Sequence, residues 1–486
     1  MEAPSTDHGR APAVEAGSHD AREVPLPLVG PFRFDQVVVE ADPDGPGSLV
    51  TLGYGAIDAD GEVVRFHERL LVPVALPETV EVTAALRVLH LVAGVSYYKC
   101  LVPAPLAVPD LSAAERAVVE ALYDEGLREL AYRNDLPVPV PVDLVDGGPD
   151  AGTVHHRDDR LIPAPAPPRR GSLVPVGGGK DSALVAALVP DGHLLTVNPV
   201  GAHEHLAQAL ERPLMRVART LDPQLQGLVA RGVTNGHVPV TAITSAIAVL
   251  VATASGLADV LMGIERSADE PTVVTADGVE VNHQFSKSAP AEALLRAAFG
   301  PTGVRYLSLL RPLTELAIGV AVARRGLADD IVSCNRAFTI WNETTASREQ
   351  RPCGSCAKCL FTALMVAPAS TPEQVARRFG RPLLDEADHV EATRELWSAE
   401  KPFDCVGERL ETAAAVVLLA GQEAWADQVV VRSLAPEARA VLDAAGVDVA
   451  DLLTVGDLAG LPSEYQPLLA DLAPDLASVA HPDAPR

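Results

Sequence analysis

The chain has 486 residues, which is too long for one ordinary domain and indicates two or three. Hydrophobic residues make up 48% of the sequence and charged residues 21%, so most of the chain can build packed cores and is not disordered. The 65 acidic and 39 basic side chains give a net charge of −26, which disfavours a nucleic-acid partner because phosphate backbones are also anionic.

The N-terminal part begins with a segment, residues 1–25, that has no apolar stretch after a basic start. It predicts a disordered tail and not a secretory signal. An α+β domain is expected over residues 26–136, because short β-type runs are broken by Asp and Gly turns and then followed by helical patterns. The predicted antiparallel strands are 37–39, 49–52 and 63–66, and the predicted helices are 82–93 and 112–132. Ser112 and Glu115 form a capping box at the start of the second helix.

A proline-rich stretch, residues 137–170, predicts an extended linker. Over residues 171–370, apolar strands alternate with helical patterns, which favours parallel βαβ units in an α/β domain: an open parallel sheet with helices on both faces. Residues 371–486 read as a helical C-terminal region.

The longest uncharged stretch, Gly232–Ala258, is long enough to cross a bilayer. It contains Pro239 and several Ser and Thr residues, which favours a buried helix packed against the sheet over a membrane span. We therefore expect a cytoplasmic protein.

A glycine-rich segment, Gly177-Gly-Gly-Lys-Asp-Ser182, follows the predicted strand 173–176 and opens a helix. Glycines let the backbone approach an anion closely, and N–H groups at a helix N-terminus then face it. The segment is not a Walker A loop, because Asp181 follows the lysine, and it is not a dinucleotide fingerprint, because Ser182 replaces the last glycine. It resembles the PP-loop of ATP pyrophosphatases, with Gly177 in place of the first serine.

That resemblance implies cleavage of ATP between the α and β phosphates, usually to adenylate a carbonyl or carboxyl oxygen. It implies that the loop (Gly177, Gly178, Gly179 and Ser182) holds the pyrophosphate. Lys180 would neutralise the pyrophosphate and Asp181 would help to bind Mg²⁺, and both count among the catalytic candidates. Adenine would lie near Val197 and Asn198 at the end of the second strand.

Four cysteines, Cys334, Cys353, Cys356 and Cys359, have spacings that can close a tetrahedral metal site. Four sulfur ligands favour structural zinc. An iron–sulfur cluster is the less favoured alternative, because a ferredoxin-type pattern needs a further cysteine where Ala363 stands. The arrangement also resembles that of 7-cyano-7-deazaguanine synthase, another PP-loop enzyme.

Four further polar segments follow or precede predicted elements, where loops of a parallel sheet line a ligand crevice. They are 235–242, 263–269, 282–288 and 333–338. Together with the glycine loop and the cysteines, they resemble the UDP-N-acetylmuramoyl-L-alanyl-L-glutamate epimerase (MurL) family. The resemblance implies an isomerase of peptidoglycan precursor synthesis, which uses ATP and Mg²⁺ to adenylate and then invert a terminal L-glutamate.

The same resemblance suggests roles for individual residues. The base could be His283, Lys287, His237 or Glu265, with His283 and Lys287 taken as the catalytic pair. A doubly charged carboxylate substrate with a pyrophosphate needs local cations, and Arg266, Arg311 and Arg336 are the arginines at motif positions. The predicted substrate-binding set is Asn235, His237, Glu265, Arg266, Asn282, Arg311 and Arg336.

Two alternatives stay open at this point. One is another PP-loop enzyme, such as a small-molecule synthase or ligase or a tRNA-modifying enzyme, although the acidic chain offers no basic surface for tRNA. The other is a non-enzymatic adenine-nucleotide sensor with a metal-stapled fold.

Overall fold

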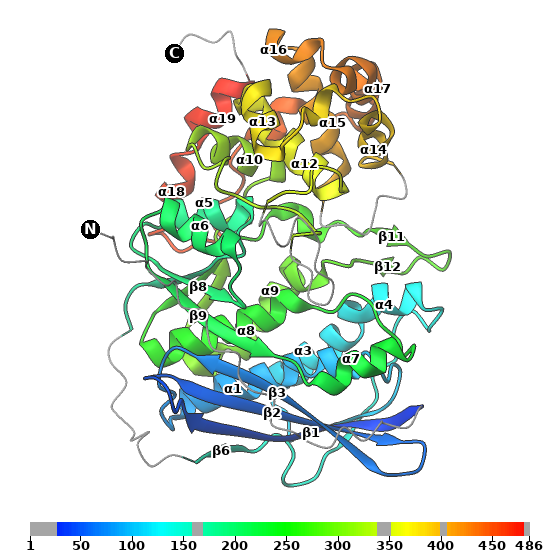
Figure 1. Cartoon of the computed structure of the whole chain (residues 1–486), viewed down its shortest axis with the longest axis vertical. Helices are drawn as coiled ribbons and strands as arrows, with labels where there is room; N and C mark the ends of the chain where they lie inside the picture. Colours follow the sequence, from blue (N-terminus) through cyan, green and yellow to red (C-terminus); the bar gives the residue numbers. More distant parts are fainter. Residues whose placement is uncertain (1–26, 158–168, 338–350, 399–405, 481–486) are drawn as a thin grey trace, which may run out of the picture.

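The computed structural model describes residues 27–157, 169–337, 351–398 and 406–480 (Figure 1). The predicted N-terminal tail, 1–25, and part of the predicted linker, 158–168, lie outside these described residues.

The N-terminal part is a three-stranded antiparallel meander covered by helices on one face. Its strands are β1 (Leu28–Ala41), β2 (Ser48–Asp58) and β3 (Val63–Val72). Exposed and buried residues alternate along β3, as expected for a sheet with only one covered face. The covering helices are α1 (Val80–Ala93), α2 (Val95–Tyr98), α3 (Ala113–Tyr123) and α4 (Arg128–Arg133).

The predicted helix 112–132 is therefore wrong in its length. The capping box of Ser112 and Glu115 is present, but α3 ends at Tyr123. Gly126 lies in the break, where an added Cβ would come within 3.2 Å of the Pro239 ring. The turn thus brings α4 against the loop that precedes α8 (Val240–Ser255).

The second part is a parallel sheet with helices on both faces. Its strand order is β13-β10-β7-β8-β9. The strands are β7 (Ser172–Pro175), β8 (His193–Val197), β9 (Leu214–Thr220), β10 (Asp259–Met262) and β13 (Arg305–Ser308). Neighbouring residues of β7 enter opposite cores, Leu173 beneath α8 and Val174 beneath α5 (Lys180–Leu188), so both faces are buried. The remaining connecting helices are α6 (Gly201–Ala209), α7 (Pro223–Ala230) and α9 (Ala289–Ala298).

The two parts share one mixed sheet, which corrects the prediction of a purely parallel one. Strand β9 pairs antiparallel with β3, through Arg69 opposite Thr220. The unpaired edges of β3 and β9 satisfy each other's backbone groups in this way. Short strands β4 (Leu106–Val108), β5 (Leu144–Asp146) and β6 (Val154–His156) extend the far side. Two of them lie in the predicted linker 137–170, and the predicted domain boundaries stay a prediction.

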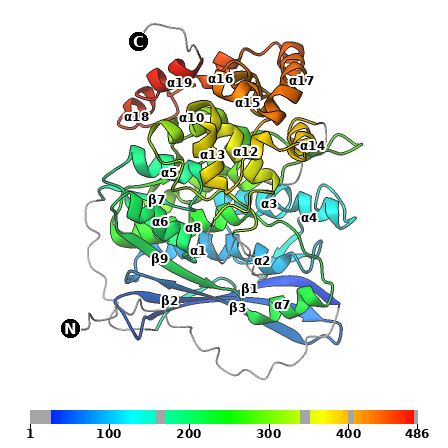
Figure 2. The same ribbon diagram turned by 45° about the horizontal axis from the view of Figure 1, so that its top comes forward.

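The C-terminal region is helical, as predicted, and packs at the end of the molecule opposite the meander (Figures 1 and 2). Its core is continuous with that of α5 and β7. The helices of this region are α13 (Pro372–Phe379), α14 (His389–Glu395), α15 (Arg409–Ala420), α16 (Glu423–Ala426), α17 (Val429–Ala445), α18 (Gln466–Ala470) and α19 (Ala473–Ala480). They pack against α10 (Glu315–Arg324) and α12 (Ala357–Val366) of the preceding part.

One helical stretch among the described residues, Val80–Tyr98, is long and apolar enough to cross a membrane, but 72% of its apolar window is buried inside the fold. The uncharged segment that follows Gly232 forms α8, whose residues pack in the core between the sheet and α1, as predicted.

Candidate functional site

The glycine loop lies where the parallel sheet reverses its winding. Strand β7 has β8 on one side and β10 on the other, so the crevice at its carboxyl end is the expected ligand site. Residues 177–179 follow β7, and Gly179 is the N-cap of α5. Gly178 has a φ of +73°, which favours glycine at this position. The predicted strand, turn and helix start are confirmed here.

Neighbouring segments hold the loop closely. Gly263, just after β10, allows this approach, because a Cβ there would lie 2.9 Å from the carbonyl carbon of Asp181. On the other side, the Val332 N–H donates to the Gly178 carbonyl at 2.6 Å, and the Lys180 N–H donates to Ser333 Oγ at 3.4 Å. The loop is therefore fixed between the end of β10 and residues 332–333.

Gly177 differs from the PP-loop pattern but leaves room for the missing side chain. No heavy atom lies within 4 Å of a Cβ built there. Its N–H instead donates to Ser182 Oγ at 3.1 Å, so the second serine of the motif orders the turn.

Lys180 lies in a cluster of carboxylates. Its buried ammonium donates to Asp181 at 2.5 Å and also to Glu315 at the start of α10. One carboxylate oxygen each from Asp181, Glu265 and Glu315 lies within 4.8 Å of the others. Carboxylate oxygens are the ligands that Mg²⁺ prefers, so this set fits the predicted magnesium. Glu265, predicted as a substrate or base residue, belongs to this cluster.

A fourth carboxyl group, Glu411 of α15, reaches the same region from the C-terminal helices. It is fully buried and accepts the Leu316 N–H at 3.0 Å, in the first turn of α10. Burial first, and then the charge of Glu408, raise the pKa of Glu411 well above its ordinary value of 4.5. The shift favours the protonated form of the carboxyl, which limits the negative charge around Lys180.

This protonation predicts a pH-dependent gain on replacing Glu411 with glutamine. The unfolded chain ionises Glu411 above its ordinary pKa of 4.5, whereas the folded chain retains the proton. Its contribution to stability is thus complete below that pH and is lost as pH rises toward the folded-state pKa. We expect the Tm difference between Glu411→Gln and the parent to become more positive from pH 5 to pH 8. A difference that does not change with pH would contradict an acid that stays protonated.

The glycine loop opens into a cleft of about 370 Å³. The cleft brings together residues from six separate segments of the chain. They are Gly177, Gly179, Lys180, Asp181, His237, Lys287, Glu315, Val332, Ser333, Cys334, Asn335, Lys358, Phe361 and Thr362. Two base candidates, His237 and Lys287, therefore face the same space as the loop. Three of the chain's five lysines line this cleft, although the net charge is −26.

The N-terminal part positions the His237 loop. The carboxylate of Glu129, in α4, accepts the His237 N–H at 3.0 Å, and the Lys99 ammonium donates to Asn235 at 2.6 Å. Gly236 packs so closely on Leu130 that a Cβ would lie 3.1 Å from its Cα. Asn235 therefore acts through this clamp, while His237 lines the cleft.

His283 lies behind His237 and does not line the cleft. Its Nδ1 is 2.6 Å from the Thr272 hydroxyl, and its ring packs edge-on against the His237 ring at 5.6 Å. Asn282 lines a different cleft of about 320 Å³, beside the hairpin of β11 (Val273–Val274) and β12 (Glu280–Val281). Of the segment 282–288, only Lys287 borders the glycine loop's cleft.

The three predicted arginines occupy different places. The Arg311 guanidinium donates hydrogen bonds to the carbonyls of Glu265 and Lys287 at 2.8 Å each. It also forms an ion pair with Glu292 at 2.9 Å. Arg311 thus fixes the backbone at Glu265 of the carboxylate cluster and at Lys287 of the cleft. Arg266 is about half exposed and lies 3.7 Å from Glu408, and Arg336 donates to Ser355 at 3.1 Å.

The predicted adenine position is braced by backbone contacts. Asn198 has a φ of +51°, and its amide accepts the Arg219 N–H at 2.6 Å and donates to the Arg219 carbonyl at 2.8 Å. Arg219 is in turn paired with the buried Glu68 of β3 at 2.7 Å. The end of β8 after Val197 is therefore held in a defined turn, and its surface stays accessible.

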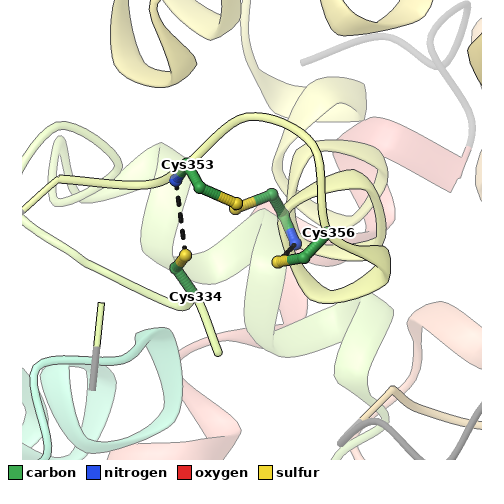
Figure 3. A group of neighbouring side chains, drawn as sticks. Cys334, Cys353 and Cys356 are labelled. Carbon is green, nitrogen blue, oxygen red and sulfur yellow. Dashed lines mark hydrogen bonds between the residues drawn. The ribbon is translucent and has the colours of Figure 1, made fainter. Parts of the chain in front are cut away.

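The four predicted cysteines come together, with one sulfur each within 4.8 Å of the others. Cys353 Sγ lies 3.8 Å from Cys359 Sγ, close to the edge of about 3.8 Å expected for sulfurs around zinc at about 2.3 Å. Backbone N–H groups of Cys353 and Cys359 donate to Cys334 and Cys356 at 3.3 and 3.4 Å (Figure 3 labels Cys334, Cys353 and Cys356). The residues fit a tetrahedral metal ion.

The metal centre adjoins the nucleotide loop. Cys334 follows Ser333, which contacts the Lys180 N–H, and the Cys359 thiol lies 4.0 Å from the Ser333 carbonyl. A metal bound here would hold residues 332–334 against the glycine loop.

Sequence reasoning did not assign Glu315 or Lys358 to the site, and it gave Ser333 only as the first residue of the polar segment 333–338. Glu315 opens a helix far from the glycine loop in sequence, and nothing local marks it as a partner of Lys180. Lys358 did carry a signal, since lysine occurs only five times in the chain and this one stands between two metal-ligand candidates.

Comparison with known proteins gives the family. The family model of the MurL N-terminal domain matches residues 29–309, and that of the MurL C-terminal domain matches residues 330–448. Curated relatives named UDP-N-acetyl-alpha-D-muramoyl-L-alanyl-L-glutamate epimerase are similar over most of their length. The one from a Micromonospora species is 38% identical over 86% of this chain and 93% of the relative, and that from Salinispora tropica is 40% identical over 78% and 84%.

A third relative with the same name, from Xanthomonas oryzae pv. oryzae, is 35% identical over 88% of this chain and 94% of its own length. No solved structure matches the chain. The alternative of a non-enzymatic nucleotide sensor is therefore wrong. The chain belongs to the MurL family and is an epimerase.

Proposed function

We propose that the enzyme inverts the terminal L-glutamate of UDP-N-acetylmuramoyl-L-alanyl-L-glutamate, using ATP and Mg²⁺ to form an acyl-adenylate. The observation that carries this proposal is the cleft in which a phosphate-type glycine loop meets two protonatable side chains, His237 and Lys287. The substrate is the one in the names of the curated relatives. The PP-loop relationship is part of the proposal.

Activation explains why an epimerase needs a nucleotide loop. Removing the α-proton beside a carboxylate creates an enolate with excess negative charge, which raises the barrier. In the first step, a carboxylate oxygen attacks the α-phosphorus of ATP, the bond to the β-phosphate oxygen breaks, and pyrophosphate leaves. The acyl-adenylate has lost the carboxylate charge, so its α-proton is far more acidic.

The chain's own residues supply the groups for this step. The loop N–H groups and the N-terminus of α5 face the pyrophosphate, and Lys180 offsets its charge. Lys180 would turn from Asp181 and Glu315 toward the phosphates as Mg²⁺ joins these carboxylates and Glu265. When bound, Mg²⁺ supplies positive charge to the phosphate oxygens.

Inversion then needs one proton removed and one returned to the opposite face. A base takes the α-proton, the planar intermediate is reprotonated, and water hydrolyses the adenylate to the D-glutamyl product and AMP. His237 and Lys287 come from different segments and both line the cleft, so they are the base candidates that the geometry favours. His283 would orient the His237 ring from behind.

This ranking of bases predicts that activation and proton transfer can be separated. Lys287→Gln and His237→Gln should retain substrate-dependent exchange of pyrophosphate into ATP but lower epimerisation by about 100-fold or more. His283→Gln should lower it by less than about 10-fold, because His283 lies outside the cleft. A larger loss in His283→Gln than in both other variants would reverse the assignment.

The cellular setting follows from the chemistry. A UDP-linked muramoyl peptide is a peptidoglycan precursor, and its D-glutamate product would serve wall synthesis. We place the enzyme in the cytoplasm, where ATP is available and the four thiols stay reduced. The metal is proposed to be structural zinc.

The direct test is nucleotide analysis. Purified enzyme with ATP, Mg²⁺ and the L-glutamate dipeptide substrate should release AMP and pyrophosphate together with the D-epimer, and release neither without substrate. Epimerisation that proceeds fully without ATP would refute the adenylation step. An amide or ester product would instead point to a PP-loop ligase.

A further inference from the structure

Among the described residues, no counter-charge contacts the cleft cation Lys358. It lies between Cys356 and Cys359 at the start of α12, is half-buried, and lines the cleft beside the glycine loop. In the part of the chain that the structure describes, its ammonium has no hydrogen-bond or ion-pair partner. In a protein with a net charge of −26, a half-buried lysine without an acidic partner is unusual.

The other two lysines of the cleft are already engaged. Lys180 donates to Asp181 and Glu315, and Lys287 donates to Gln284 Oε1 at 3.0 Å. Arg311, one of the predicted arginines, is occupied by Glu292 and two carbonyls. Within the described residues, Lys358 is therefore the cleft lysine that is available to a ligand's oxyanion.

We propose that Lys358 binds the side-chain carboxylate of the substrate's terminal glutamate and so sets the specificity for an acidic residue there. The inference rests on the proposed function. Once the α-carboxylate is adenylated, the side-chain carboxylate is the remaining charge on the reacting residue, and entering the cleft strips it of water. A lysine ammonium offsets that cost through a charge-assisted hydrogen bond. The pyrophosphate already has the glycine loop, α5 and Lys180.

The metal centre explains how the backbone at Lys358 is held in place. Cys356 and Cys359 flank Lys358 in the sequence, and both belong to the four-sulfur cluster. A bound metal ion fixes the backbone on both sides of Lys358, so little backbone entropy is lost when the ligand arrives.

The test compares Lys358→Gln and Lys358→Arg with the parent on two substrates, the L-glutamate dipeptide and its L-glutamine analogue, which lacks the side-chain charge. Epimerisation is followed directly by product chirality. We expect Lys358→Gln to raise KM for the glutamate substrate by about 10- to 100-fold and to remove the preference for glutamate over glutamine. KM for ATP should change by less than about 2-fold, and Lys358→Arg should recover most of the preference.

Controls separate this result from folding and from the proposed mechanism. Arg377→Gln, which removes one positive charge from an exposed residue paired with Asp329, should behave as the parent. Metal content and Tm should be unchanged in Lys358→Gln. A rise in KM for ATP with an unchanged glutamate preference would overturn the proposal and assign Lys358 to the nucleotide phosphates. If Lys358→Gln leaves KM unchanged for the glutamate substrate and for ATP, the proposal for Lys358 is wrong. If the parent forms no AMP, adenylation is refuted, and the preference for glutamate over glutamine still tests Lys358.

Discussion

Replacing Lys180 with alanine is expected to lower ATP-dependent epimerisation by about 1000-fold or more and also to destabilise the fold. The activity loss follows because Lys180 is the cation at the glycine loop, and a single preorganised charge or donor at a reacting centre contributes about 100- to 1000-fold or more. The stability loss follows because the side chains of Lys180 and Glu315 are only 4% and 8% exposed. Removing one partner of a buried ion pair costs about 3 kcal/mol.

A second substitution separates the two effects. In Lys180→Ala combined with Glu315→Gln, the unpaired buried charge is gone, so Tm should recover most of the loss. Activity should stay as low as in the single variant, since the phosphate-binding cation is still missing. Recovery of activity along with Tm would mean that Lys180 acts only through stability.

Replacing Cys356 with serine is expected to release the metal and to weaken nucleotide binding together with stability. Structural zinc contributes folding free energy directly, so we expect Tm to fall by more than about 10 °C. Nucleotide affinity should fall because Ser333 and Cys334 connect the metal centre to the glycine loop. Metal analysis of the parent should find one zinc per chain.

Cys100→Ser is the matched control, because Cys100 is also a free thiol but lies outside the cluster. It should retain the metal, with only the modest destabilisation that an altered core side chain causes. Fully active protein without zinc, or an iron–sulfur absorption band in the parent, would decide against a structural zinc site.

The sequence predicts those parts of the fold that depend on neighbouring residues. The turn at Gly178 and the start of α5 follow from a short run of glycines after an apolar strand, and the capping box at Ser112 needs only four residues. The cysteine cluster was also predictable, because three of its ligands lie within seven residues. In each case, the residues that decide the structure are close in sequence.

Contacts between distant segments escaped prediction for the opposite reason. The pairing of β3 with β9 depends on which strand edges remain unpaired after both parts fold. The residues of neither strand indicate this. Glu315 meets Lys180 from 135 residues further along the chain. The clamp of Glu129 on the His237 loop likewise depends on the turn at Gly126 that ends α3 early. Thus the site's loop was predictable, whereas the pairing of Lys180 with Glu315 was not.

The measurement that tests the account most directly is α-carbon deuteration. The enzyme is incubated with the L-glutamate dipeptide substrate in deuterated water, with and without ATP, and the α-position of recovered substrate and product is analysed by mass spectrometry and NMR. The account predicts deuterium at the α-carbon of the D-glutamate product, and no α-deuterium in substrate recovered without ATP. Exchange at the same rate without ATP would contradict activation of the carboxylate before proton removal. An inverted product that keeps its original α-hydrogen would contradict proton removal followed by reprotonation from a second group that exchanges with solvent.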